Sequence, residues 1–313
     1  MKRLIAILAA AHVVASVFAA DGVRVASWNL KWFPAGHPVK DIAARTANDV
    51  KYESYRINTT ARFIRRQNAD VVMLEEVRSR SVCDILANTC DEVITNAAAK
   101  GWKVVACSEF QAPPDAAVPA HQNAIISHIP AIDAGWCEWK EEDGLRPPRG
   151  YTFAVFDIGG KLTALVCVHL KSNFIPADAP DPEGAPAVNR KLREISARQL
   201  VAFAKELKAK KYGDRKVENV IIGGDFNTSV FDEKYKDETT IKTLLDAGFK
   251  DCHEGVQERN TMPESKWYPA TCFDYMFFLG KAEVFAPVVA PPAKFGKHHN
   301  NLSDHQMISV MVR

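Results

Sequence analysis

The 313-residue sequence predicts a mixed α/β fold within a single domain. Short apolar runs of strand length recur along the chain, and several end in polar side chains, as the runs at 165–169 and 220–225 do. Two longer segments, 49–67 and 189–209, repeat apolar residues at helical spacing. An apolar content of 47% is enough for a sizeable core, and no linker or internal repeat divides the chain. We therefore expect strands and helices to share one core.

The predicted strands follow one another along the whole chain. They lie at 23–28, 69–74, 102–106, 123–127, 151–156, 162–168, 220–224, 271–278 and 307–312. Gly159 and Gly160 lie between two of them and indicate a hairpin. Trp136 and Trp139 fall in an amphipathic stretch, which fits a packed strand better than an aromatic patch for bases or a membrane.

Helices are predicted at 49–67, 189–209 and 240–248, with a mixture of helix and loop at 83–100. Four arginines of the first helix are expected to face solvent: Arg56, Arg62, Arg65 and Arg66.

The first residues have the pattern of a secretory signal peptide. Met1-Lys2-Arg3 is basic, and the apolar run from Leu4 to Phe18 is too short to span a bilayer. We expect residues 1–19 to be a signal peptide that is cut after Ala19 and residues 20–313 to form a single catalytic domain, with an uncleaved anchor as the alternative. The protein would then be secreted or periplasmic, with no stable membrane insertion after cleavage.

Signal cleavage leaves the chain without net charge. Of its 40 lysines and arginines, Lys2 and Arg3 are lost, which leaves 38 against 38 acidic residues. Proteins that hold nucleic acid by bulk charge carry a basic excess, so the composition argues against that class. It permits a nuclease whose cleft is locally positive, and we expect a monomer.

Seven cysteines in an exported chain suggest disulfides. The simplest pairs are local ones, Cys83–Cys90, Cys107–Cys137 and Cys252–Cys272, although sequence does not fix the connectivity. Cys167 would remain as a small apolar residue inside a strand.

The stretch Val220–Thr228 carries the clearest functional signal. An apolar strand ends in Gly223 and Gly224, which allow a sharp turn or a close approach, and Asp225 and Asn227 follow two positions apart. In an extended chain their side chains point to the same side, where both offer oxygen ligands. A strand that ends in an Asx-rich turn is an equally open interpretation.

Two further strand-type segments carry ligand-type residues at an end. Asp304 and His305 open the last strand, where neighbouring side chains point to opposite sides, so one could hold a metal while the other addresses a substrate. His169 closes the strand at 162–168. These positions predict a site at strand ends.

Six short motifs, taken in order, resemble those of the endonuclease/exonuclease/phosphatase superfamily. They are Trp28-Asn29-Leu30, Leu74-Glu75-Glu76-Val77, His169-Leu170-Lys171-Ser172, Gly223 to Asn227, Asp274-Tyr275 and Ser303-Asp304-His305. The resemblance runs from about Val23 to Val312 and points to a pancreatic deoxyribonuclease-like, exported bacterial-type member. It implies a four-layer α/β/β/α sandwich with two mostly antiparallel sheets face to face, helices outside, and the active site at strand ends along one edge.

The resemblance also implies roles for the matched residues. The metal ligands would be Asn29, Glu76, Asp225, Asn227 and Asp304. All are hard oxygen donors, which favour Mg²⁺ or Mn²⁺ over a zinc site. The catalytic set would be His169, Asp225, Asn227, Asp274 and His305. In it, Asp274 orients His305 as the base, and His169 serves as the acid or as a donor to the phosphate.

Three more residues are candidates for substrate binding. Relatives place a polar residue near Asn123 within reach of the substrate phosphate. Arg146 and Arg149 lie on a proline-stiffened loop and suit phosphate, although a solvated turn explains them equally well. Glu75 stands where many relatives carry glutamine, and the extra carboxylate could alter cation affinity.

The remaining histidines and one loop have weaker signals. His121 and His128 are expected at the surface and not as ligands, and His298 and His299 in a mobile basic loop and not on phosphate. The segment 175–187, rich in proline, alanine and aspartate, could form a lid or rim.

Three functions compete. The first is an exported, divalent-metal-dependent phosphodiesterase, an endonuclease that hydrolyses DNA or RNA by His-activated water attack on phosphorus. The second is a phospholipid or phosphomonoester hydrolase on the same site, of the sphingomyelinase kind. The absence of a long apolar hairpin in the sequence favours the nuclease over it. The third is a non-catalytic binding module, which the complete set of matched residues disfavours.

Overall fold

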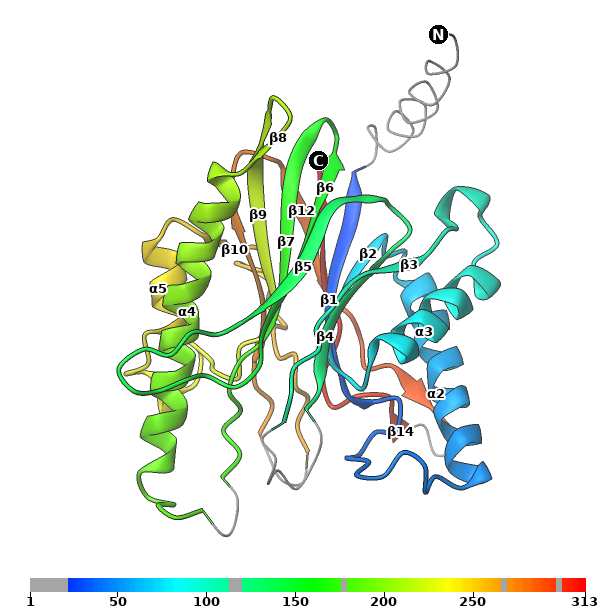
Figure 1. The fold of residues 1–313 in the computed structure, drawn as a ribbon, viewed down its shortest axis with the longest axis horizontal. Coiled ribbons are helices and arrows are strands. Elements are labelled where there is room, and N and C mark those ends of the chain that lie inside the picture. The colour runs from blue at the N-terminus through cyan, green and yellow to red at the C-terminus, as the bar shows by residue number, and fades with distance from the viewer. Residues whose placement is uncertain (1–21, 113–119, 176–178, 266–268, 297–299) are drawn as a thin grey trace, which may run out of the picture.

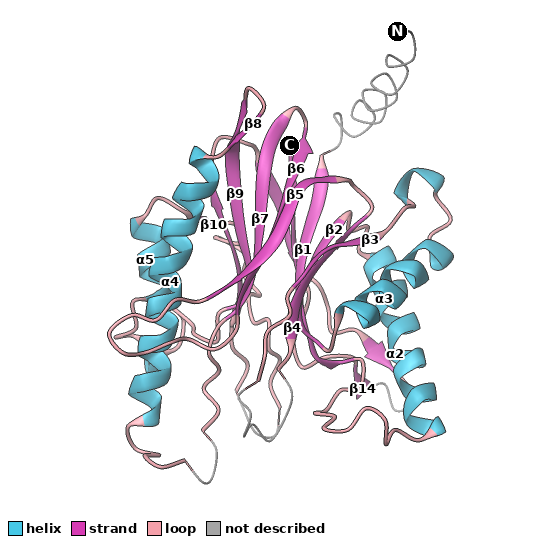
Figure 2. Cartoon of the chain, viewed as in Figure 1, coloured by secondary structure: helices cyan, strands magenta, loops and turns pink. Residues whose placement is uncertain are grey.

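Two large β-sheets lie face to face and carry helices on their outer sides (Figure 1; Figure 2). The computed structural model describes residues 22–112, 120–175, 179–265, 269–296 and 300–313. Helices α2 (Ala47–Arg66) and α3 (Arg80–Val93) cover one sheet, and α4 (Ala185–Ala209) and α5 (Thr240–Asp246) cover the other. The predicted α/β architecture with two packed sheets is confirmed.

The strand order places the first and the last strand side by side within one sheet. The first sheet runs β12 (Val284–Val289), β15 (Ile308–Val312), β1 (Val23–Phe33), β2 (Val71–Val77), β4 (Gln122–Ser127) and β3 (Lys103–Cys107). The second runs β10 (Lys250–Asp251), β11 (Asp274–Leu279), β9 (Arg215–Asp225), β7 (Lys161–His169), β6 (Gly150–Ile158) and β5 (Ala131–Glu138), and β8 (Lys211–Tyr212) pairs with β9. A small hairpin joins β13 (Lys294–Phe295) to β14 (Asn300–Asn301), and short 3₁₀ turns lie at Ala97–Ala99 and Glu233–Tyr235.

Most neighbouring strands are antiparallel, as predicted, but two pairs are parallel. β1 and β2 set Asn29 beside Glu75, and β7 and β9 set His169 beside Asp225. β11 runs antiparallel to β9 and sets Asp274 beside Asp225. Because parallel strands end at the same edge of a sheet, these pairings gather polar residues along one edge of the sandwich.

Aliphatic side chains fill the space between the two sheets, and two glycines let the backbone come close there. A Cβ built on Gly223 would lie 2.4 Å from Cε of Met73 in the opposite sheet. Gly224 has a φ of 148°, and a Cβ there would lie 1.9 Å from the carbonyl oxygen of Val168. Only glycine fits at position 224, where the close atom is backbone, whereas at 223 it is the end of a flexible methionine side chain; Gly224 thus allows β9 to reach the sheet edge directly before Asp225.

The helices agree with the sequence pattern to within a few residues at their ends. α2 begins two residues before its predicted start, at a capping box in which Thr46 Oγ1 accepts from the Asp49 amide and the Asp49 carboxylate accepts from the Thr46 amide. α4 begins at Ala185, inside the predicted rim loop at 175–187, of which 176–178 lie outside the described residues.

Arg56 was expected to face solvent, and that expectation is wrong. Its side chain is 1% exposed, and its guanidinium donates to the carbonyl oxygens of Leu30, Pro34 and Leu302. These carbonyls belong to the segments that lead away from Asn29 and toward Ser303. Arg56 therefore ties two segments of the candidate site together from behind.

All seven cysteines are free thiols, so the predicted disulfides are absent. Cys83 and Cys90 both lie on α3, seven residues and therefore about 10 Å apart along the helix, which is beyond the reach of a disulfide. Cys107 and Cys137 belong to different sheets. The thiol of Cys83 instead lies next to that of Cys107, between α3 and β3.

The third predicted disulfide fails for a similar reason. The Cys252 amide donates to the Met276 carbonyl on the neighbouring strand, whereas Cys272 lies four residues before Met276, about 13 Å along an extended chain. Cys167 is fully buried within β7, as expected for a small apolar residue.

In the described part of the chain, no helix combines the length and the apolarity that a bilayer crossing needs. The predicted signal peptide at 1–19 lies outside the described residues, and so do His298 and His299.

Candidate active site

The predicted site residues converge where β1, β2, β7 and β9 end, at the lower edge of the sandwich in Figure 1. The backbone there is unusual. Eight non-glycine residues of the described chain have positive φ, and five of them lie at this edge: Lys31, Trp32, Glu76, Arg149 and Asn227. Such conformations cost about 1–3 kcal/mol each and persist only where the surrounding structure imposes them, which is common at functional sites.

Asn29 joins the two acidic residues of the site. Its Nδ2 donates to Glu76 Oε1 at 3.1 Å and to Asp225 Oδ2 at 3.0 Å, and its Oδ1 accepts from the amide of Lys31. Burial alone would raise the pKa of Glu76, but the neighbouring His121 imidazole and the Asn29 amide lower it below the usual value. Glu76 is therefore an ionised carboxylate at neutral pH.

The structure agrees with both interpretations of the motif that contains Asp225 and Asn227, an oxygen ligand for the site and an Asx turn. The Asn227 amide donates to Asp225 Oδ1 at 2.8 Å, which is an Asx turn, while Oδ2 of the same carboxylate faces the site. The Asn227 side chain donates to the carbonyl of Leu170. Burial, together with the nearby charges of Asp274 and Glu76, raises the pKa of Asp225 to about 7 despite the opposing effect of His305.

His305 lies between two carboxylates. Its Nδ1 is 2.8 Å from Asp274 Oδ2, which also accepts from Thr261 Oγ1, and its Nε2 is 3.8 Å from Asp225 Oδ2. Burial alone would lower the pKa of His305, but Asp274 and Asp225 outweigh it and raise the pKa well above the usual value. Asp274 fixes the ring so that Nε2 points into the site.

His169 approaches the same oxygen from β7. Its Nε2 lies 3.6 Å from Asp225 Oδ2 and 3.9 Å from Glu76 Oε1. Behind it, Arg149 donates to the carbonyl oxygens of His169 and Leu170. Burial first, and then the Arg149 charge, lower the pKa of His169 well below the usual value, so the imidazole is neutral at neutral pH.

Asp304 takes a different position from the other expected metal ligands. Its carboxylate pairs with Lys31 Nζ at 2.9 Å, and its side chain is 37% exposed. Among the described residues, the groups of closely spaced ligand atoms contain Glu76 and Asp225 but not Asp304. The structure therefore places Asp304 at the rim.

The three candidates for substrate binding also differ from one another. Asn123 is fully buried on β4, and its Oδ1 makes no hydrogen bond, so an acceptor remains free near the site. Arg149 is occupied with backbone carbonyls, as described above. Arg146 donates to the Trp139 carbonyl and pairs with Glu138 on an exposed surface, which agrees with the solvated-turn alternative.

Glu75 lies beneath the site and not in it. Its Oε1 accepts from Ser27 Oγ at 2.9 Å and from Cys167 Sγ at 3.2 Å. Burial, reinforced by the Asp274 charge, raises the pKa of Glu75 well above the usual value, so the group is a neutral acid. Glu75 therefore adds no charge to the site.

His121 is the residue that the sequence analysis missed. It was expected at the surface, but its Nδ1 lies 3.4 Å from Glu76 Oε2 and its ring packs against that of Trp32, tilted by 35° and with centroids 3.7 Å apart. It precedes β4 directly, so the position at a strand end was the one available signal. His128, at the other end of β4, pairs with Asp70 at 2.8 Å, and its side chain is only 2% exposed.

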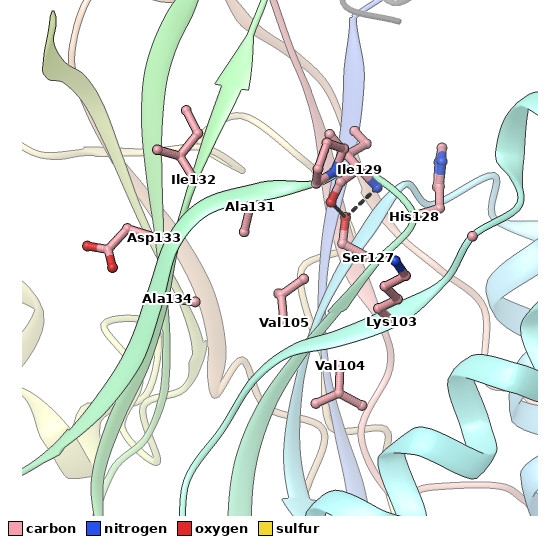
Figure 3. Close-up of a pocket in the computed structure, with 12 residues that line it drawn as sticks. Lys103, Val104, Val105, Ser127, His128, Ile129, Ala131, Ile132, Asp133 and Ala134 are labelled. Atoms are coloured by element: carbon pink, nitrogen blue, oxygen red, sulfur yellow. Dashed lines mark hydrogen bonds between the residues drawn. The ribbon is translucent and has the colours of Figure 1, made fainter. Parts of the chain in front are cut away.

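An open hollow of about 680 Å³ lies near His128, between the β3–β4 and β5 segments (Figure 3). Ser127 on its wall pairs with Val71, at the opposite end of β2 from Glu76. None of the residues that line this hollow belongs to the predicted site, so it has no part in the chemistry considered below.

Comparisons with solved structures reveal the same architecture in proteins with low sequence identity. An endonuclease/exonuclease/phosphatase family protein from Leptotrichia buccalis is 15% identical, with 93% of this chain and 99% of that chain covered and a TM-score of 0.57. A truncated TDP2 from Caenorhabditis elegans is 16% identical, with 93% and 96% covered and a TM-score of 0.57. A mutant beta toxin from Staphylococcus aureus with bound magnesium ions is 15% identical, with 93% and 100% covered and a TM-score of 0.59.

At these identities, the solved structures establish the fold alone. No curated protein sequence matches the chain. The model of the Endonuclease/Exonuclease/phosphatase family, however, matches residues 26–305, which include every motif described above. The chain therefore belongs to the endonuclease/exonuclease/phosphatase family.

Proposed function

We propose that the protein is an exported phosphodiesterase that depends on Mg²⁺ or Mn²⁺ and hydrolyses DNA or RNA as an endonuclease. Family members are hydrolases of phosphoester bonds. The observation that carries the proposal is the pair of imidazoles, His169 and His305, which lie 3.6 and 3.8 Å from the same oxygen of Asp225. The pKa values of the two imidazoles are shifted in opposite directions, so the two rings can play different roles on opposite sides of one phosphorus atom.

The donor atoms of the site suit a hard divalent cation. Glu76 and Asp225 offer carboxylate oxygens, Asn29 holds both of them through its Nδ2, and Asn227 lies beside them. The raised pKa of Asp225 reflects carboxylates crowded together in a buried place, which a cation would relieve. When bound, Mg²⁺ would neutralise the phosphoryl oxygens and stabilise the leaving oxygen. Asp304 would contribute only by leaving its pair with Lys31.

His305 is the candidate base. Asp274 accepts a hydrogen bond from Nδ1–H, which leaves Nε2 facing the site; in the unprotonated ring, whose share grows as pH rises, Nε2 can take a proton from the attacking water. Thr261 holds the same Asp274 oxygen and so keeps the carboxylate in place. Asp274 is thus the third group that orients the base, His305.

His169 acts as a neutral N–H donor to the phosphate. The sequence left open whether it is an acid or a donor. Its lowered pKa favours the donor, because an imidazolium is disfavoured in a buried place beside Arg149. The Arg149 bonds to the carbonyls of His169 and Leu170 hold the ring at the end of β7.

A phospholipid substrate is the second candidate, and one observation favours it. Three apolar side chains are exposed on the segments that follow β7 and β9: Phe174 at 71%, Val230 at 57% and Phe231 at 62%. Asn173 Nδ2 donates to the Asn227 carbonyl and so links these two segments. An apolar rim next to a phosphoester site would suit a lipid interface.

A substrate panel tests the proposal. Purified protein is incubated with plasmid DNA, RNA, sphingomyelin and inositol phosphates in Mg²⁺, Mn²⁺, Ca²⁺ or EDTA. Nicking of plasmid or cleavage of RNA that stops in EDTA is expected, and sphingomyelin hydrolysis without nuclease activity would favour the second candidate. Activity that survives EDTA, or full activity in His305→Ala, would overturn both. Export is tested separately by N-terminal sequencing of the protein from the culture medium or periplasm, and the monomeric state by light scattering.

A further inference from the structure

We propose that Glu76, His121 and His169 form a binding site for a zinc-class transition-metal ion, next to the hard-ion site and sharing Glu76 with it. The three residues come from different parts of the fold: the end of β2, the residue before β4 and the end of β7. The proposal does not depend on the proposed reaction, because it states only which metal these three residues bind.

The spacing of the ligand atoms fits a tetrahedral ion. One donor atom from each residue lies within 4.8 Å of the other two. In a zinc site with bonds of about 2.1 Å, neighbouring ligand atoms lie about 3.4 Å apart. Glu76 Oε2 and His121 Nδ1 are already 3.4 Å apart, and His169 Nε2 is 3.9 Å from Glu76 Oε1. A movement of the His169 ring toward the other two ligands would complete the triad, which would leave a fourth position for water.

The donor types separate this site from the hard-ion site. Two imidazoles and one carboxylate are the ligand set of many zinc centres, whereas Mg²⁺ prefers oxygen. The Glu76 carboxylate serves both sides: Oε1 accepts from Asn29, on the side of Asp225, and Oε2 faces His121. The carboxylate thus presents one oxygen to each side, and His169 Nε2 approaches the oxygen that Asn29 holds.

His121 Nδ1 lies beside Glu76 without a hydrogen-bond partner, and His169 Nε2 has only long contacts with the nearby carboxylates. His121 Nδ1 is buried and makes no hydrogen bond. His169 is 3% exposed, and its Nε2 is 3.6 Å from Asp225 and 3.9 Å from Glu76, beyond normal hydrogen-bond length. Buried polar atoms in native proteins usually have a partner. A metal ion supplies one to both nitrogens at once.

Trp32 fixes the geometry of the triad. Its backbone amide donates to Glu76 Oε2 at 3.0 Å, and its ring packs against that of His121 at a centroid distance of 3.7 Å. The same residue thereby orients two of the three ligands, as second-layer partners of metal sites do. An ion pair between His121 and Glu76 would explain their contact but not the convergence of His169 on the same carboxylate.

Occupancy by zinc has a consequence for the neighbouring site. Zinc would engage Glu76 and His169, and the proposed phosphodiesterase reaction uses both. We therefore expect zinc to inhibit hydrolysis in the presence of Mg²⁺.

The test is calorimetric titration of metal-free protein with Zn²⁺, which requires no catalysis. Wild type should bind one ion tightly, and His121→Ala should weaken the dissociation constant by more than about tenfold. His37→Ala, which removes an exposed histidine nearby, should bind zinc as wild type does. Equal zinc affinity in wild type and His121→Ala would overturn the inference.

Diffraction at the zinc edge gives a second readout that needs no variant. An anomalous peak should lie within bonding distance of Glu76, His121 and His169 in zinc-soaked crystals. A peak elsewhere would overturn the inference even if the titration showed tight binding. Failure of the nuclease assay would leave both results unaffected, so the two proposals fail separately.

Discussion

Replacing Asp274 by asparagine tests how the second carboxylate controls His305. Oδ2 of Asp274 takes hydrogen bonds from Thr261 and His305, whereas Oδ1 is buried and makes none. An asparagine whose oxygen occupies the Oδ2 position satisfies both donors. His305 then keeps its tautomer and loses only the negative charge beside it.

The expected loss of rate is therefore modest. A hydrogen bond to a charged group contributes about 1.5–3 kcal/mol and a neutral one about 0.5–1.5 kcal/mol. The difference of about 1–1.5 kcal/mol corresponds to a fall of about tenfold in rate. The asparagine NH₂ at the Oδ1 position would be a buried donor without a partner, which should also lower stability by about 1–3 kcal/mol.

The pH profile moves in a defined direction. Burial opposes the raised pKa of His305, and the Asp274 charge is the main cause that overcomes it. A base acts only when it is unprotonated, so removal of the charge should shift the acidic limb of the rate profile to lower pH. The assay is the initial rate on the substrate that the panel identifies, measured across pH for wild type and Asp274→Asn.

Asp246→Asn, an exposed carboxylate paired with Lys242, is the matched control and should behave as wild type. An unchanged rate and profile in Asp274→Asn would refute the role of Asp274. A loss near 10⁴-fold, as an inverted tautomer produces in a serine protease triad, would refute the retained tautomer.

Three further predictions follow from the described contacts. Arg56→Met should lower the free energy of unfolding, measured in urea, by about 3 kcal/mol or more, because three buried carbonyls lose their donor. The control Arg65→Met, at an exposed position, should change it by less than about 0.5 kcal/mol. Equal effects of the two substitutions would contradict the anchoring role of Arg56. Mild oxidation by a small-molecule disulfide should join Cys83 to Cys107, and non-reducing peptide mapping that finds another intramolecular pair would contradict the contact between them. Mg²⁺ should raise the melting temperature fully above pH 7, and this rise should shrink as pH falls through about 7. The reason is that the ion must displace the proton that burial and nearby carboxylates place on Asp225. A rise that does not depend on pH would count against Asp225 as a ligand.

The sequence was most informative where polar residues interrupt apolar strands. Asp225 follows a run that could only be a buried strand, and His169 closes another. The pattern marked both strand ends, and the family resemblance implied that the two residues share a site; β7 and β9 are parallel neighbours, so their ends do meet. The helices were found for a similar reason, since their apolar spacing must match the sheet they cover.

The residues that were misjudged depend on contacts that no local pattern contains. Arg56 carries the same charge as Arg62 on the same helix, and only the carbonyls of other segments decide that one is buried and the other exposed. His121 lies outside any periodic segment, and its place beside Glu76 follows from the pairing of β2 with β4. Arg149 looked like a phosphate ligand, but the chain uses it to hold the end of β7.

The disulfides failed because nearness in sequence was a poor guide to nearness in space. Cys83 and Cys90 are close along the chain, yet two helical turns separate them. The thiol that Cys83 meets belongs to β3, which α3 covers.

The most direct test of the central claim is the position of a bound Mn²⁺ ion. Crystals grown with Mn²⁺ should show an anomalous peak that is coordinated by Glu76 and Asp225, with Asn29 beside it and His169 and His305 on either side. A peak remote from these two carboxylates, or saturating Mn²⁺ with no peak between them, would contradict the account.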